Sequence, residues 1–298
     1  MQGLLLINKP EGITSFKAVY VTRKLTDTKK VGHTGTLDPL ATGVLPILIG
    51  RATSLSSYLL NADKRYIATV KAGLVTDTLD ITGKVLATNE ANFTIEDLNK
   101  AILAFTGEQL QYPPMFSAIK KDGVPLYKLA RKGQEIEVEA RKINIFSIKL
   151  LDFNEKNKTF SIDVHCSKGT YIRSLCRDLG EFLGCGATMT SLKRTATGTF
   201  TLEQCIDLDS LNQENICENI LSEELAVSHL PTLFVSEKQA LRFSNGGKLS
   251  FDRLNQKVED GEYLRVKYKD TFIGIGYADS VKREIRIMCL INPMEATK

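Results

Sequence analysis

The sequence predicts an α+β fold, with a mixed, largely antiparallel central sheet flanked by helices and a small β-rich domain after it. Two observations predict this class. Strand, hairpin and helix patterns follow one another through the first 200 residues without the regular βαβ alternation of a parallel sheet. After Pro231, a short helical pattern precedes three strand patterns, which is typical of a small β-rich domain. The 298 residues are enough for one sizeable domain and a small one.

Local patterns place the elements of the N-terminal half. The compact apolar run 44–49 and the alternating segment 65–72 predict two strands. A helix is predicted to begin at Thr94, whose hydroxyl suits the N-cap position, and to end at Gly107. The next predicted elements are a strand at 115–120, a turn at 121–123 and a short helix from Pro125 to Gly133.

The C-terminal half is assigned in the same way. Segments 143–151 and 159–166 predict a hairpin, and a helix is predicted over 171–183 because Gly184 stops it. One or two helices are expected within the acidic stretch 202–225. The small domain is expected to contain a helix at 237–243, a turn at 245–247 and strands at 263–268, 272–278 and 285–290.

Charge is distributed unevenly along the chain. Residues 1–200 carry 27 Lys or Arg against 19 Asp or Glu, residues 201–231 carry seven acidic residues and no Lys or Arg, and residues 232–298 carry 12 basic and nine acidic residues. We therefore expect a domain at 1–205, an acidic connector at 206–231 and a second domain at 232–298. Two basic blocks favour a polyanionic partner. Ordinary surface charge that happens to segregate is the alternative.

Several protein classes are disfavoured by composition. No apolar run approaches the roughly 20 residues needed to span a bilayer, and the first residues do not form a signal peptide, so we expect a cytoplasmic protein. The six cysteines form no Cys-x-x-Cys pair and the three histidines are far apart, which predicts reduced thiols and no metal site. We expect a monomer that needs no protein partner, because a polyanion would already occupy the basic surface.

The segment 31–43 is the least ordinary stretch of the chain. Within 13 residues it holds three glycines, three threonines, one histidine and an Asp-Pro pair. This density indicates a tightly specified loop. On composition alone, Asp38 is a turn-forming residue before Pro39. The loop is not a phosphate-binding P-loop, since no Gly-Lys-Ser/Thr follows at the required spacing.

This loop nevertheless resembles a known catalytic signature. The sequence Gly-His-Thr-Gly-Thr-Leu-Asp-Pro-Leu-Ala-Thr-Gly-Val-Leu, at 32–45, is similar to that of the bacterial tRNA pseudouridine synthase B family. Further segments resemble the motifs of this family in the same order, at 8–15, 63–66, 76–80, 112–118 and 166–173. Together they span most of residues 1–200, which makes coincidence a poor explanation.

The resemblance implies a fold and a reaction. It implies the pseudouridine synthase fold and the conversion of uridine to pseudouridine in the T loop of tRNA, at position 55. The N1–C1′ bond breaks, the base rotates while held, and C5 bonds to C1′, with no cofactor. The target nucleotide must first be flipped out of its stack. A carboxylate in such a site can attack carbon as a nucleophile or accept a proton.

The resemblance also implies roles for individual residues. Asp38 is expected to be the catalytic carboxylate, with Arg173 as the cation that keeps it ionised. Without the resemblance, Arg173 would be interpreted as a phosphate contact or an ordinary helix-surface residue. Tyr66 is expected to stack on the target base, although a tyrosine in an alternating strand is usually a half-buried core residue. Tyr171 is expected to line the pocket. His33 is expected to fill space in the RNA loop.

Contacts to RNA phosphates are expected from cations that flank the motifs. They are Lys9, Lys64, Arg65 and Lys168, each of which would otherwise read as a solvated surface residue. The basic segment 112–133 resembles an insertion that closes over the tRNA arm, although a charged surface hairpin would look the same; its cations are Lys120, Lys121, Lys128, Arg131 and Lys132. Residues 232–298 resemble a small β-barrel RNA-binding domain of the PUA type.

Two other readings share this fold. A non-catalytic RNA-binding or RNA-folding protein would not need Asp38, Tyr66 and Arg173 together. A guide-RNA-dependent relative that works within a larger particle is disfavoured by the compact length and the absence of long basic tails.

Overall fold

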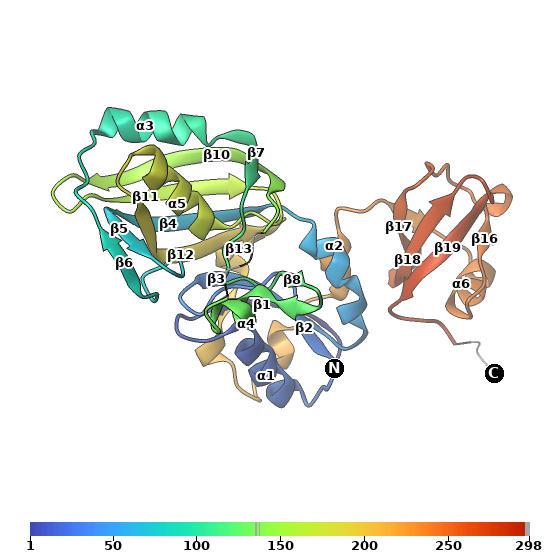
Figure 1. The fold of residues 1–298 in the computed structure, drawn as a ribbon. Helices are drawn as coiled ribbons and strands as arrows, with labels where there is room; N and C mark the ends of the chain where they lie inside the picture. The colour runs from blue at the N-terminus through green and yellow to red at the C-terminus, as the bar shows by residue number, and fades with distance from the viewer. Residues whose placement is uncertain (135, 137, 296–298) are drawn as a thin grey trace.

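A computed structural model describes residues 1–134, 136 and 138–295. It consists of a large body built around one sheet and a smaller body at the C-terminal end (Figure 1). In the described residues, the large sheet has ten strands, with the order β14-β1-β3-β12-β4-β11-β10-β7, and with β2 paired to β3 and β13 paired to β12. Its strands are β1 (Gly3–Lys9), β2 (Val31–His33), β3 (Thr42–Ile49), β4 (Lys64–Ala72), β7 (Gly107–Gln111), β10 (Arg141–Asn154), β11 (Thr159–Cys166), β12 (Ala187–Thr197), β13 (Phe200–Thr201) and β14 (Ile206–Asp207).

Most neighbouring strands of this sheet are antiparallel. The parallel pairs are β1 with β14 and β3 with β12. The strands predicted at 44–49 and 65–72 and the hairpin predicted at 143–151 and 159–166 are confirmed as β3, β4, β10 and β11. The expected mixed, largely antiparallel sheet is therefore present.

Helices cover one face of the large sheet. They are α1 (Ser15–Thr26), α3 (Ile95–Ala104) and α5 (Ile172–Phe182), while the short α2 (Ser56–Leu60) follows β3. Apolar side chains of these three helices share one core with alternate residues of the strands, for example Leu5 and Ile7 of β1. The predicted N-cap at Thr94 is confirmed, because its hydroxyl accepts from the Asp97 amide and Asp97 closes a capping box.

Small hairpins complete the large body. They pair β5 (Leu74–Thr76) with β6 (Val85–Thr88), and β8 (Lys120–Lys121) with β9 (Val124–Pro125), which leads into α4 (Leu126–Ala130). The strand predicted at 115–120 is wrong apart from its last residue. Backbone carbonyls of this region are taken by side chains of α5 instead of by a strand partner: Ser174 donates to Tyr112 O, and Arg173 donates to Phe116 O.

The acidic stretch 202–225 contains no α-helix among the described residues, so that prediction is also wrong. Short 3₁₀ turns occupy it, at Leu202–Gln204, Leu208–Ser210, Cys217–Asn219 and Glu223–Val227. Its backbone is held by β1: Leu4 and Leu221 exchange backbone hydrogen bonds of 2.9 and 2.7 Å, and Ile206 of β14 pairs with Ile7. The segment expected as a connector is thus built into the edge of the large body.

The C-terminal body is a five-stranded sheet with one helix, counted over the described residues, with the order β15-β17-β18-β19-β16. Its elements are β15 (Thr232–Phe234), α6 (Glu237–Ser244), β16 (Leu249–Ser250), a 3₁₀ turn (Phe251–Arg253), β17 (Tyr263–Tyr268), β18 (Thr271–Asp279) and β19 (Glu284–Leu290). The predicted helix and three predicted strands are confirmed. The last three residues of the expected domain, 296–298, lie outside the described part of the chain.

An apolar interface joins the two bodies. Leu4 and Leu6 point to the face of β1 opposite Leu5 and Ile7, and they share a core with Phe272 and Ile275 of β18. Val44 and Leu48 of β3, together with residues of η1 (Gly50–Leu55), belong to the same core. Strands β1 and β3 are therefore buried on both faces. No helix among the described residues is long and apolar enough to cross a membrane.

This shared core predicts that the two bodies lose stability together. Phe272 is 4% exposed, so Phe272→Ala leaves a cavity at the interface and should lower the free energy of unfolding by about 3–5 kcal/mol. Urea denaturation followed by circular dichroism measures this change. Leu103→Ala, at a side chain that is 74% exposed, is the control and should change stability by less than about 0.5 kcal/mol. If the wild-type protein unfolded in two well-separated transitions, the two bodies would not share a core.

Candidate active site

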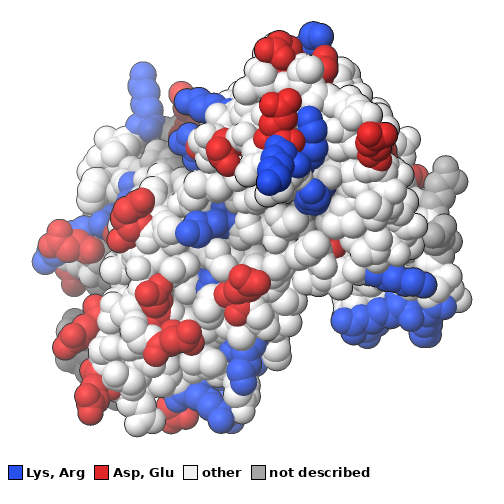
Figure 2. Space-filling model, turned by 90° about the vertical axis from the view of Figure 1, so that its left-hand side faces the viewer, with Lys and Arg blue, Asp and Glu red and all other residues white. Residues whose placement is uncertain are grey.

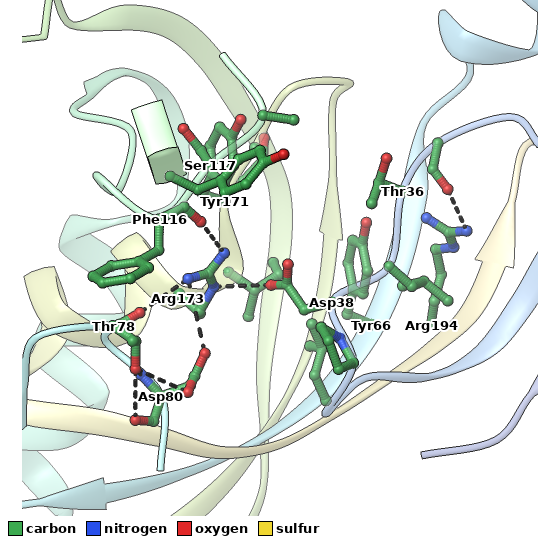
Figure 3. A pocket seen from close by; sticks show the side chains of 18 of the residues that line it. Thr36, Asp38, Tyr66, Thr78, Asp80, Phe116, Ser117, Tyr171, Arg173 and Arg194 are labelled. Atoms are coloured by element: carbon green, nitrogen blue, oxygen red, sulfur yellow. Dashed lines mark hydrogen bonds and ion pairs between the residues drawn. The ribbon is translucent and has the colours of Figure 1, made fainter. Parts of the chain in front are cut away.

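A cavity of about 690 Å³ opens between the 31–43 loop, the middle of the large sheet and the 112–133 segment. Asp38 and Thr36 come from the loop, Tyr66 from β4, and Tyr171 and Arg173 from the start of α5 (Figure 3). Phe116, Ser117, Tyr127 and Arg131 line it from the 112–133 segment, and Arg194 lines it from β12. The cavity therefore gathers residues that are distant in sequence.

The loop that carries Asp38 is anchored by local contacts. Leu37 is buried, and its backbone exchanges hydrogen bonds with the Ser15 hydroxyl at the start of α1, at 2.8 and 3.0 Å. The Asp38 carbonyl accepts from the Ala41 amide at 3.0 Å, which closes a turn around Pro39. The Asp38 side chain, 36% exposed, consequently points into the cavity rather than into the turn.

Arg173 is the direct partner of Asp38. Its Nε lies 2.9 Å from Asp38 Oδ2, and its side chain is only 5% exposed. The other guanidinium nitrogens donate to Thr78 O and Phe116 O, both at 2.9 Å, and Nη1 lies 3.8 Å from Asp80 Oδ2. All of these contacts are visible in Figure 3. A guanidinium held on three sides cannot swing away, so it fixes the Asp38 carboxylate.

Asp80 supports Arg173 from the turn after β5. Its Oδ1 accepts from the Thr78 hydroxyl at 2.9 Å and from the Thr82 amide and hydroxyl at 3.0 and 2.5 Å. Its other carboxylate oxygen faces Arg173. Because Asp80 is held by its own turn, it is a fixed negative charge behind the guanidinium.

The pKa of the Asp38 carboxyl is raised above its ordinary value, chiefly because the group is buried at the cavity floor. The Arg173 guanidinium opposes this rise most strongly, whereas the nearby Asp80 carboxylate adds to it. The ionised form of Asp38 therefore depends on Arg173.

Tyr66 lies on the other side of Asp38 in Figure 3. It is 8% exposed, and its ring belongs to the edge of the main core while it also lines the cavity. Burial raises the pKa of the Tyr66 phenol, which keeps the hydroxyl protonated at neutral pH. The nearby Arg194 guanidinium, on β12, opposes this rise in the pKa.

Two expected phosphate contacts are buried, so the alternative interpretation of them as solvated surface residues is wrong. Lys9 is fully buried, and its Nζ donates to the carbonyls of Pro10 and Ile13 at 2.7 and 2.9 Å. Lys64 is also buried and donates to the carbonyls of Leu60 and Ala62. Burial lowers the pKa of each amine to about 8. Both ammonium groups hold backbone carbonyls that would otherwise lack donors.

The other expected RNA contacts lie nearer the surface. Arg65 forms two hydrogen bonds with Asp163, at 2.8 and 2.9 Å, and Lys168 donates to Asn61 Oδ1 at 2.7 Å. Tyr171 lines the cavity and is the residue before α5. His33 ends β2, and burial lowers its pKa. On the face in Figure 2, basic and acidic side chains are interspersed, except on a projecting lobe that carries a cluster of Lys and Arg.

Sequence reasoning missed two charged residues of the site. Asp80 is in the motif at 76–80, but nothing in its spacing shows that it faces Arg173. Arg194 belongs to β12, a strand that the local patterns did not predict, although the alternation from Ala187 to Thr197 could have indicated it. Among the described residues, no three His, Cys, Asp or Glu side chains are grouped so as to hold a metal ion.

Comparison with solved structures identifies the fold. The chain superposes on a chain of a solved structure titled "Crystal Structure of a Cbf5-Nop10-Gar1 Complex" with a TM-score of 0.74 and 25% identity, covering 98% of this chain and 85% of that one. A structure of an H/ACA RNP bound to a substrate RNA containing 2′-deoxyuridine gives a TM-score of 0.73 at 24% identity, with the same coverage. The expected pseudouridine synthase fold is confirmed.

The family follows from sequence. The model of the TruB family pseudouridylate synthase N-terminal domain matches residues 23–172, and that of the tRNA pseudouridylate synthase B C-terminal domain matches residues 173–232. The chain is 48% identical over 277 residues to tRNA pseudouridine synthase B of Clostridium tetani, which covers 93% of this chain and 95% of that protein. The protein of this name from Chromobacterium violaceum is 43% identical over 301 residues, covering 99% and 97%. The chain belongs to the TruB family of pseudouridylate synthases.

The charges around Asp38 make opposite predictions for two variants. Arg173→Gln removes the strongest influence that lowers the Asp38 pKa, so this pKa should rise further. Asp80→Asn keeps the hydrogen bonds to Thr78 and Thr82 but removes a like charge, so the same pKa should fall. Titration of the Asp38 carboxyl carbon by NMR measures both shifts. If the Asp38 pKa rose in both variants, or fell in both, then Arg173 and Asp80 would not act on Asp38 through their charges.

Proposed function

We propose that this chain isomerises uridine to pseudouridine at position 55, in the T loop of tRNA, and that Asp38 is its catalytic carboxylate. The observation that carries the proposal is the Asp38–Arg173 pair at the floor of the cavity, beside Tyr66. Membership of the TruB family and the names of its relatives support the substrate.

The cavity geometry suits a nucleotide that has left its stack. A uridine that enters beside Tyr66 presents its base and ribose to Asp38, with the Tyr66 ring available for stacking. Cleavage of the N1–C1′ bond frees the base, which rotates within the cavity, and C5 then bonds to C1′. The proton on C5 leaves and N1 gains a proton, so the product is an isomer of the substrate. Stacking and the enclosed walls keep the free base from diffusing away.

Arg173 has two tasks in this proposal. It keeps Asp38 ionised against the effect of burial, and it fixes the carboxylate in one orientation. Its remaining donors are taken by Thr78 O and Phe116 O, so it holds the turn before Asp80 and the 112–133 segment together. Arg173 is thus committed to the protein and not to an RNA phosphate.

RNA contacts outside the cavity are assigned to residues near its mouth. We propose His33 and Tyr171 as contacts to the flipped loop, and Arg65 and Lys168 as contacts to phosphates once they leave their present partners. The 112–133 segment contributes Tyr127 and Arg131 to the cavity wall, which supports a role in closing over the RNA. The C-terminal body is proposed as a further, PUA-like RNA-binding domain. Since tRNA is a cytoplasmic substrate, we place the activity in the cytoplasm.

Tritium release from RNA labelled at C5 of uridine measures turnover. The purified chain alone should release tritium from an unmodified tRNA transcript, and Asp38→Asn should release none above background, because an amide is neither a nucleophile nor a base here. Asp27→Asn, at the exposed C-cap of α1, is the matched acid-to-amide control and should keep wild-type activity. If wild type and Asp38→Asn released equal amounts of tritium, Asp38 would not be the catalytic carboxylate. RNA binding without release by wild type would indicate a non-catalytic RNA-binding protein.

Arg173→Ala separates chemistry from binding. Turnover should fall by about 1000-fold while the Kd for the transcript changes little, because Arg173 fixes Asp38 and contacts no phosphate in this proposal. Single-turnover tritium release and filter binding measure the two quantities. Arg177→Ala, one turn further along α5 and paired with Asp178, is the control and should leave both unchanged. Loss of binding in Arg173→Ala would make Arg173 a phosphate contact.

A further inference from the structure

Arg194 is a buried charge without a carboxylate partner. It is 1% exposed, and among the described residues no Asp or Glu lies within ion-pair distance of its guanidinium. It also lowers the pKa of Lys9, Lys64 and His33, each of which is already lowered by burial. A buried charge of this kind disfavours the folded state unless its donors are well used.

The donors of Arg194 are used on the backbone of the loop that carries Asp38. Nε donates to Val44 O at 2.7 Å, and Nη2 donates to Gly35 O at 3.1 Å. These two carbonyls lie on opposite sides of Asp38 in sequence, one near the start of the loop and one just beyond its end. The planar fork of the guanidinium reaches them through two different nitrogens held in a fixed geometry, which the single nitrogen of an ammonium group does not reproduce.

Strand register places Arg194 between the loop and Tyr66. In the large sheet, Arg194 of β12 pairs with Tyr66 of the antiparallel β4 and with Gly43 of the parallel β3. Paired residues of neighbouring strands project to the same face of a sheet. The guanidinium that binds the two loop carbonyls therefore lies on the Tyr66 side of the sheet, and Tyr66 and Arg194 are near each other in Figure 3.

Gly43 shows how closely the loop approaches β12. Its φ is +103°, and a Cβ there would lie 2.2 Å from Arg194 O and 2.9 Å from Arg194 N. Only glycine allows this approach, so the end of the loop is pressed against the backbone of Arg194 while its start is held by the Arg194 side chain.

We propose that Arg194 is a positioning residue that clamps both ends of the Asp38 loop and orients Tyr66, so that carboxylate and ring keep their relative placement during the reaction. The proposal rests on the proposed function. Arg194 binds the loop backbone and is the strand partner of Tyr66, and it acts on the nucleotide through them. The proposal predicts that loss of the clamp, the two hydrogen bonds from Arg194 to Val44 O and Gly35 O, lowers the rate of the chemical step and leaves the affinity for RNA unchanged.

Two substitutions separate the clamp from the charge. Arg194→Gln removes both, and Arg194→Lys keeps the charge but replaces the two donor nitrogens, Nε and Nη2, by one. Both variants should show single-turnover rates about 100-fold below wild type, the effect of a displacement of about 1 Å at a reacting group. Their Kd for the tRNA transcript should stay within about threefold of wild type. The midpoint of the acid limb of the pH–rate profile should stay at the same pH, because the Asp38 pKa is set chiefly by burial and by Arg173, which both variants retain.

Amide hydrogen exchange measures the local stability of the Asp38 loop independently of activity. The Ala41 amide donates within the loop to Asp38 O, so it should exchange faster in both variants, whereas core amides of β11 should not change. Gly43→Ala keeps Arg194 but forces the loop from β12, so it should give the same rate loss and faster exchange at Ala41.

Arg265→Gln is the matched control. Arg265 is a poorly exposed arginine of β17, in the C-terminal body (Figure 1), whose Nε donates to Leu230 O at 2.8 Å and which does not line the cavity. It should lower the melting temperature and leave the single-turnover rate unchanged. If the control lost as much rate as the Arg194 variants, the effect of Arg194 on the rate would come from a general loss of stability and not from positioning of the loop. A wild-type rate in Arg194→Lys would show that charge alone suffices, and unchanged exchange at Ala41 in a slow variant would remove the loop from the explanation.

The proposed function and the clamp fail in different ways. If the wild-type chain releases no tritium, the proposed function is wrong, and exchange at Ala41 still tests the clamp. If Arg194→Gln does not fold, Arg194→Lys carries the same comparison, because it keeps a long, positively charged side chain at this position.

Discussion

The ion pair between Asp38 and Arg173 constrains much of the structure. A guanidinium that is 5% exposed is stable only when its donors are matched, so the fold must bring acceptors to it from several segments. The turn after β5 supplies Thr78 O and Asp80, the 112–133 segment supplies Phe116 O, and the loop supplies Asp38. Three parts of the chain are therefore fixed around the first turn of α5, and the cavity is the space that they enclose.

Positive charge dominates the surroundings of this pair. Lys9, Lys64, Arg173 and Arg194 are buried in or beside the cavity, and the cavity lining includes the carboxylates of Asp38 and Asp80. Three of these cations, all but Arg173, donate mainly to backbone carbonyls, which solvate charge without neutralising it. The resulting field favours an anionic polymer at the cavity mouth and an ionised carboxylate at its floor.

Prediction from sequence succeeded where the information is local. The alternation at 65–72, the N-cap at Thr94 and the strands after residue 262 are confirmed, because periodicity and capping act over a few residues. It failed at 115–120 and 202–225, where tertiary partners take the backbone hydrogen bonds. The pairing of Asp38 with Arg173 came from the resemblance of whole motifs. Asp80 and Arg194 were missed, and Lys9 and Lys64 were placed at the surface, because burial of a charge is decided by contacts across the sheet.

The position of β12 bears on how the protein is made. Strands β3 and β4 are not neighbours, and each pairs with β12, which comes near the end of the large body in sequence. During synthesis, the loop with Asp38 leaves the ribosome long before Arg173 and Arg194 do. Until β12 is in place, the two halves of the sheet have no common strand and the cavity lacks the residues that β12 supplies. A nascent chain therefore cannot assemble the cavity before most of the large body has been synthesised.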